Sequence, residues 1–138
     1  MTAFLVDTNV LSEIVRPTPD ERVLKFLARE SDLWISVVSL HELAYGAARI
    51  VEAGRRHRLT SWLESIRARF NGRLIVIDEA IAHAAGRARG QALIQGHTIS
   101  ALDALIAASA LARSLTLATR NIRDFESLQI ALIDPWRD

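Results

Sequence analysis

The sequence lacks cysteine altogether, and it has one lysine, three prolines and few aromatic residues. Without cysteine, a disulfide scaffold, an iron–sulfur site, a thiolate zinc site and a catalytic thiol are all excluded. No apolar run approaches the ~18 residues that a membrane-spanning helix needs, and residues 1–6 are too short for the apolar core of a signal peptide. We therefore expect a soluble, cytoplasmic protein that does not associate with membranes.

The residues that are present fit one folded domain over 1–138. Half of the 138 residues are apolar and 24% are charged, with a net charge of +1, which excludes intrinsic disorder. Lys25 is the only lysine, so nearly all basic residues are arginine. This bias fits either a GC-rich genome or phosphate recognition by the guanidinium fork. The mean hydropathy of +0.16 is high for a small monomer and favours a homodimer.

Strand and helix signals alternate along the chain. Short apolar segments typical of buried strands lie at 3–6, 33–37, 74–77, 116–118 and 131–133. Helices are expected at 8–15, after Asp20, from Ser39 to 53 with Gly54 as terminator, at 58–70, from Asp78 to Gly96 and at 101–115, with a loop or single turn at 120–125. The alternation predicts an α/β fold in which helices flank a mainly parallel sheet, and ligands bind such sheets beyond the carboxyl ends of the strands.

Three acidic residues are placed to meet at that edge. Asp7 follows the first predicted strand, and Glu42 and Asp103 each lie in the first turn of a predicted helix. Crowded carboxylates raise one another's pKa, and a divalent cation relieves the repulsion. Oxygen ligands alone favour Mg²⁺ or Mn²⁺, which can provide a hydroxide for attack on a phosphodiester. The alternative is helix capping, because Ser39 and Ser100 stand three residues before Glu42 and Asp103 as in a capping box.

Four segments resemble, in order, the motifs of PIN-domain ribonucleases: 7–13 (DTNVLSE), 39–46 (SLHELAYG), 101–108 (ALDALIAA) and 117–125 (LATRNIRDF). The ending at 134–136 (DPW) resembles the FitB-like members, and the chain is similar to VapC-type toxins of toxin–antitoxin pairs. The resemblance implies an α/β/α PIN fold and an endoribonuclease that cleaves RNA with Mg²⁺ or Mn²⁺. It also implies a homodimer and a cognate VapB-like antitoxin as inhibitor.

The resemblance places the catalytic metal ligands of the family on Asp7, Glu42 and Asp103. The fourth family position is often aspartate, and here it falls on Asn121, which can hold a metal-bound water but carries no charge. Asp124, three residues later, either substitutes for it or stabilises the following turn. We expect one metal ion or none in the RNA-free protein, with Asn121 in contact through water at most.

Supporting roles are expected of other polar residues. Thr119 matches a hydroxyl position that supports the site in the family, and Asn9 either orients Asp7 or is an ordinary residue of a first helical turn. Arginines can neutralise RNA phosphates, although those near Gly54 also fit a solvated turn between helices. The candidates are Arg49, Arg55, Arg56, Arg58 and Arg120.

Two rival functions were weighed. Receiver domains and haloacid-dehalogenase-type phosphatases also place aspartate after their first strand, but both need a lysine late in the chain, and Lys25 comes too early. A non-catalytic PIN-like module that binds RNA or a protein partner is the second rival. Such modules usually lose acidic residues, whereas Asp7, Glu42 and Asp103 are all present. The sequence therefore favours the enzyme.

Overall fold

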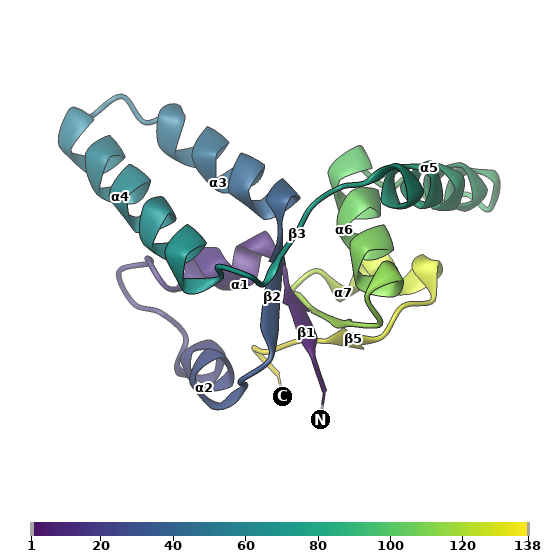
Figure 1. Ribbon diagram of the computed structural model, residues 1–138, viewed down its shortest axis with the longest axis horizontal. Coiled ribbons are helices and arrows are strands. Elements are labelled where there is room, and N and C mark those ends of the chain that lie inside the picture. Colours follow the sequence, from purple (N-terminus) through teal and green to yellow (C-terminus); the bar gives the residue numbers. More distant parts are fainter. Residues whose placement is uncertain (1, 138) are drawn as a thin grey trace.

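A five-stranded parallel sheet forms the centre of the structure, a computed structural model that describes residues 2–137 (Figure 1). The strands are β1 (Phe4–Val6), β2 (Leu33–Ser36), β3 (Leu74–Ile75), β4 (Thr116–Ala118) and β5 (Leu132–Ile133). They are arranged in the order β3-β2-β1-β4-β5, and every neighbouring pair is parallel. The predicted α/β class and the predicted positions of the strands are confirmed.

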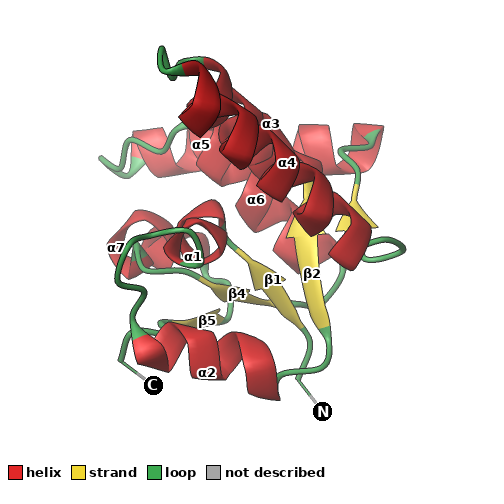
Figure 2. Cartoon of the chain, turned by 90° about the vertical axis from the view of Figure 1, so that its left-hand side faces the viewer, coloured by secondary structure: helices red, strands yellow, loops and turns green. Residues whose placement is uncertain are grey.

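Helices cover both faces of this sheet. They are α1 (Thr8–Glu13), α2 (Glu21–Arg29), α3 (Val37–Ala48), α4 (Ala53–Arg69), α5 (Glu79–Ile94), α6 (Ala101–Ala112) and α7 (Ile122–Phe125), followed by a 3-10 turn at Glu126–Leu128. Helices α3 and α4 form one hairpin and α5 packs on α6, while α2 lies at the end of the sheet where both termini emerge (Figures 1 and 2). No helix within residues 2–137 is long and apolar enough to cross a membrane.

Strand β1 separates two apolar cores. Because side chains alternate across a strand, Leu5 points to one face while Phe4 and Val6 point to the other. The core on the Leu5 side is built largely by α5 and α6, and includes Ile81, Ala85, Ile106 and Ala107. The opposite core includes Val10, Leu11, Val23 and Phe26. Burial on both faces fixes β1, and therefore fixes the residue that follows it.

Most helix starts agree with the sequence. Asp20 accepts a hydrogen bond from the backbone N–H of Arg22 at 2.9 Å and begins α2. Asp78 accepts from the N–H of Ile81 at 2.8 Å and begins α5. These carboxylates satisfy N–H groups that the first turn of a helix leaves unpaired.

The predicted boundary at Gly54 is wrong. Helix α3 ends at Ala48, and Gly54 lies in the first turn of α4 rather than after a long helix. The reason is Glu52, whose carboxylate accepts from the N–H groups of Gly54 at 2.8 Å and Arg55 at 2.6 Å. This cap starts α4 five residues before the predicted start at residue 58.

The strand order creates a switch point between β1 and β4. The chain builds β2 and β3 on one side of β1, and then crosses to build β4 and β5 on the other side. The crevice outside the carboxyl ends of two such strands is where open α/β sheets bind ligands. Asp7 follows β1 and Thr119 follows β4, and the N–H of Asp7 donates to the carbonyl of Ala118 at 2.9 Å.

Candidate active site

Asp7 is the fixed centre of the site at the switch point. Its side chain is buried, with 5% of the residue exposed. Oδ1 accepts a hydrogen bond from the N–H of Thr8 at 2.8 Å, and Oδ2 accepts from the hydroxyl of Thr119 at 2.7 Å. Asp7 therefore caps α1, as predicted by the alternative of helix capping. Its orientation is set by Thr8, which comes shortly after β1, and by Thr119, which follows β4.

Burial controls the ionisation of Asp7. Loss of hydration raises its pKa from 3.8 to about 6, although the hydrogen bonds from Thr119 and Thr8 act in the opposite direction. The negative charges of Asp103 and Glu42 raise the pKa further. The three predicted carboxylates are thus close enough to repel one another, and a bound cation would relieve that repulsion.

Glu42 is held by a hydrogen-bond chain rather than by a capping box. Helix α3 begins at Val37 because the hydroxyl of Ser36, at the end of β2, accepts from the N–H of Val38 at 3.0 Å. The predicted cap at Ser39 is therefore wrong. Ser39 is buried inside the helix, 2.8 Å from the hydroxyl of Thr8, and that hydroxyl donates to Oε1 of Glu42 at 2.7 Å.

Asp103 lies in the first turn of α6, where the predicted cap is confirmed. The hydroxyl of Ser100 accepts from the N–H of Asp103 at 3.1 Å. Partial burial raises the pKa of the Asp103 carboxyl, as do the charges of Asp124 and Glu42, while hydrogen bonding to Ser100 lowers it. Ser100 thus caps α6, and the half-buried Asp103 lines the cavity.

All three carboxylates line one cavity of about 360 Å³. The rest of its wall consists of Thr8, Asn9, Ser12, Glu13, Arg16, Arg120, Asn121 and Trp136. Polar groups from α1, α3, α6 and the segment after β4 therefore converge on a space large enough for a small anionic group. The sequence made these three residues candidates to meet at the edge of the sheet, and the structure brings them to one cavity.

The donor set fits a hard divalent cation. Carboxylate and amide oxygens are the ligands that Mg²⁺ and Mn²⁺ prefer, and no sulfur donor is available in this sequence. Within residues 2–137, however, no three acidic or histidine side chains converge closely enough to hold one ion together. Metal binding by these residues stays a prediction.

Thr119 joins the supporting residues into one network. Its buried hydroxyl donates to Asp7 and lies 3.4 Å from Nδ2 of Asn9 and 3.1 Å from the N–H of Asn121. Asn9 also reaches Oδ2 of Asp7 at 3.4 Å. The side chain of Asn121 lines the cavity, whereas Asp124 lies on the exposed side of α7 and acts on Asp103 through its charge.

The predicted RNA-binding arginines have different environments. Arg49, Arg55 and Arg58 line a second cavity of about 1160 Å³, which shares Glu42 with the acidic cavity. Arg56 instead donates to the carbonyls of Ile50 at 2.9 Å and Val51 at 3.3 Å. It therefore stabilises the turn between α3 and α4, and its predicted role in RNA binding is not supported.

The sequence analysis missed Glu13, Arg16 and Trp136 as residues of the site. Glu13 is buried, accepts from the N–H of Asp20 at 2.8 Å and lies 3.6 Å from the guanidinium of Arg16. Glu13 and Arg16 are three residues apart around the end of α1, a spacing that brings side chains together on a helix. That spacing was the available signal. The ending at 134–136 singled out Trp136 by resemblance, but it did not indicate that this residue lines the cavity from the far end of the chain.

Comparisons with known proteins agree with this geometry. The sequence model of the PIN domain family matches residues 4–130. The chain is 38% identical to "Toxin FitB" of Neisseria gonorrhoeae over 97% of its own length and 99% of that protein. It is 30% identical to "VapC ribonuclease Y4jK" of Sinorhizobium fredii, over 96% of both chains. A chain in the crystal structure of FitAcB from Neisseria gonorrhoeae superposes with a TM-score of 0.92 and 37% identity, covering 98% of this chain and 99% of that one.

Proposed function

Because this chain belongs to the PIN-domain family, we propose that it is the ribonuclease toxin of a toxin–antitoxin pair and that Mg²⁺ or Mn²⁺ serves its reaction. The observation that carries the proposal is the meeting of Asp7, Glu42 and Asp103 on one cavity at the switch point of the sheet. Relatives named as toxin and as ribonuclease cover almost the whole chain and support the same activity.

The residues that line the cavity have different roles in phosphodiester hydrolysis. When bound, the cation lowers the pKa of a water molecule and offsets the charge of the phosphate. Asp7 and Asp103 would hold it, Asp7 in the orientation set by Thr8 and Thr119. Thr8 keeps Glu42 at the wall of the cavity. The amides of Asn9 and Asn121 are placed to hold water, and the arginines that line the cavity can bind phosphate.

Purified protein free of antitoxin tests this function directly. We expect it to cleave RNA, to lose that activity in EDTA and to regain it with Mg²⁺ or Mn²⁺. Expression without antitoxin should stop growth, and co-expression of the cognate VapB-like antitoxin should suppress both growth arrest and cleavage. A chain that binds RNA but never cleaves it, with any divalent cation, would instead be the non-catalytic module.

A homodimer is the assembly that we expect. Several apolar side chains stand in solvent, with Ile94 88% and Val51 93% exposed, and Tyr45, Leu93 and Leu111 more than half exposed. Together with the mean hydropathy of +0.16, these exposed side chains favour burial of apolar surface between two subunits. Light scattering should give twice the chain mass of 15.3 kDa, and a monomer at high micromolar concentration would contradict the dimer.

Substitutions at Asn121 test how the site balances charge. Asn121→Asp adds a carboxylate beside Asp7, Glu42 and Asp103 and should tighten Mg²⁺ binding without abolishing cleavage. Asn121→Ala should impair cleavage less than Asp103→Asn, because it removes an orienting amide and leaves the three charges in place. Metal-titrated ribonuclease assays on the three variants measure this order. If Asn121→Ala is as inactive as Asp103→Asn, then Asn121 is a primary residue of the site.

A further inference from the structure

Three cavities meet around Arg16. The acidic cavity has the 1160 Å³ cavity between α1, α3 and α4 on one side. On another side lies a cavity of about 820 Å³, between the start of α2 and the end of the chain. Arg16 lines all three, and Arg120 lines the acidic cavity and the 820 Å³ cavity. Both arginines therefore lie where the acidic cavity borders a neighbouring cavity. An RNA strand bound at the acidic cavity and continuing into that neighbour would pass them.

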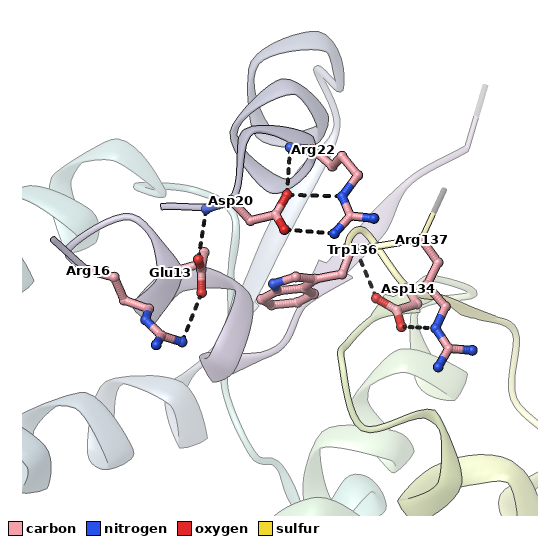
Figure 3. Close-up of polar contacts among 7 residues, drawn as sticks. All are labelled: Glu13, Arg16, Asp20, Arg22, Asp134, Trp136 and Arg137. Atoms are coloured by element: carbon pink, nitrogen blue, oxygen red, sulfur yellow. Dashed lines mark hydrogen bonds and ion pairs between the residues drawn. The ribbon is translucent and has the colours of Figure 1, made fainter. Parts of the chain in front are cut away.

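The arginines around the 820 Å³ cavity differ in how firmly they are paired (Figure 3). Arg22 is the most firmly paired, since Nε and Nη2 donate to the two oxygens of Asp20 at 3.1 and 2.8 Å and form a bidentate ion pair. Arg16 lies 3.6 Å from Glu13, and 60% of its side chain is exposed. Within residues 2–137, Arg120 makes no ion pair. The charge of Arg22 is therefore offset by Asp20, whereas the charges of Arg16 and Arg120 are more available to an anionic ligand.

Arg120 is held in place by an aromatic ring and by its own backbone N–H. Its guanidinium carbon lies 5.0 Å from the centre of the Trp136 ring, a cation–π contact. Trp136 is only 7% exposed, so its ring is a firmly packed support, and its backbone N–H donates to Oδ1 of Asp134 at 2.9 Å. The backbone N–H of Arg120 donates to Oδ1 of Asn9 at 3.3 Å. Arg120 is thus positioned relative to both the tryptophan and the acidic cavity.

We propose that Arg16 and Arg120 bind RNA phosphates adjacent to the phosphate that is cleaved, and that the 820 Å³ cavity beside Trp136 receives the adjoining nucleotide. This inference rests on the proposed ribonuclease function. Carboxylates at the acidic cavity repel the neighbouring phosphates of a substrate, and two guanidinium forks at its boundary offset that repulsion with paired, charge-assisted hydrogen bonds. The volume lies within the ~300–1000 Å³ of cavities that hold small organic ligands, so a nucleotide fits.

The test compares two substrates that differ in flanking phosphates. One is an oligoribonucleotide, and the other is bis(p-nitrophenyl) phosphate, a small diester with none. Arg120→Ala and Arg16→Gln should each raise KM for the oligoribonucleotide about tenfold, since each removes hydrogen bonds to a charged group. The loss of kcat/KM on the oligoribonucleotide should exceed the loss on the small diester at least about fivefold. The slope of log affinity against log salt should fall by about 0.7 for each lost phosphate contact to a single strand.

Arg22→Ala is the matched control, because Arg22 lines the same 820 Å³ cavity but is occupied by Asp20. We expect its KM for the oligoribonucleotide to stay within about twofold of the native value. Arg120→Lys keeps the charge but loses the fork, so its KM should be intermediate. Melting temperatures within a few degrees of the native value exclude misfolding of the variants. If Arg16→Gln unfolds, the kinetics of Arg120→Ala alone test the proposal.

Each other outcome overturns the inference. Equal losses on both substrates would mean that the arginines act at the cleaved phosphate or on the fold. An equal loss in Arg22→Ala would mean that only overall charge matters. Variants that cleave normally but escape the antitoxin would assign the two arginines to carboxylates of the protein partner. If the native protein cleaves neither substrate, the proposed function itself is wrong, and that result is distinct from the other three.

Discussion

Glu42→Gln should lower kcat/KM for RNA cleavage at least ~100-fold while leaving the melting temperature nearly unchanged. Glutamine keeps a carbonyl oxygen that can accept from the hydroxyl of Thr8, so the local contact survives. Helix α3 is capped by Ser36, so no cap is lost. The change removes one negative charge from the cavity, and with it much of the attraction for a divalent cation. Metal-saturated cleavage assays and melting curves measure the two effects separately.

Thr8 provides the matched control for this experiment. Thr8→Val keeps the shape of the side chain but removes the hydroxyl that links Ser39 to Glu42. We expect an intermediate loss, because Glu42 keeps its charge but not its orientation. Thr8→Ser should restore most of the activity. If Glu42→Gln cleaves RNA at the native rate, the assignment of Glu42 to the site is wrong, whatever the Thr8 variants do.

Asp7→Asn should abolish cleavage and yet stabilise the metal-free protein. The rise in the pKa of Asp7 from 3.8 to about 6 corresponds to at most ~3 kcal/mol of folding free energy at neutral pH. Asparagine carries no charge to desolvate and is also a good N-cap. The asparagine amide has one acceptor oxygen where the carboxylate has two, so the hydroxyl of Thr119 loses its acceptor. This loss cancels part of the gain in stability. We expect a net increase of about 1 to 2 kcal/mol in the free energy of unfolding.

The pH dependence of that difference identifies its cause. Asp7 binds a proton more tightly in the folded protein, with a pKa of about 6, than in the unfolded chain. Its contribution to stability is therefore complete below pH ~4 and is lost as the pH rises through 6. The advantage of Asp7→Asn over the native protein should be small near pH 4 and largest above pH ~7. Denaturant unfolding in EDTA at several pH values measures it, and a difference that does not change with pH would contradict the buried charge.

Added Mg²⁺ should reverse the order of stability. A ligand that binds only the folded state stabilises it by mass action, so Mg²⁺ should raise the melting temperature of the native protein. The Asp7→Asn variant lacks the central ligand and should respond weakly. The same residue would then limit the stability of the empty protein and allow metal binding, a conflict that is common where function requires buried charge.

The sequence predicted the sheet edge at which the site lies because that edge depends on local patterns. Short apolar segments placed β1 and β4, and parallel strands necessarily end at the same edge. Asp7 and Thr119 follow those strands directly, which places both at that edge, whereas the pairing of β1 with β4 that brings them into contact is seen only in the structure. Period-two alternation in β1 likewise determines which residues enter each core.

The sequence could not predict which of two suitable residues begins a helix. Ser36 and Ser39 are both good N-caps, and the choice depends on where β2 stops. Gly54 does not end a helix, because the carboxylate of Glu52 accepts from two N–H groups and so caps the start of α4. Neither result follows from residue preferences, since both depend on the path of the backbone between two helices.

The parts of the site built from distant segments were also beyond the sequence. Arg56 and Arg58 belong to one arginine cluster, yet Arg56 donates to the turn before α4 and Arg58 lines the 1160 Å³ cavity, because residues two apart on a helix do not share a face. Arg16 and Trp136 approach the site from opposite ends of the chain. Only the folded structure brings Arg16 and Trp136 together, because no spacing in the sequence relates these two residues to each other.

Anomalous scattering from crystals of the antitoxin-free protein soaked in Mn²⁺ is the sharpest test of metal binding by Asp7 and Asp103. We expect one Mn²⁺ peak in the acidic cavity, with oxygens of Asp7 and Asp103 as its closest protein ligands and Asn121 in contact through water at most. The peak should vanish in Asp103→Asn crystals soaked under the same conditions. A peak elsewhere in the molecule, or an equal peak in the variant, would contradict the assignment of these carboxylates as the metal site.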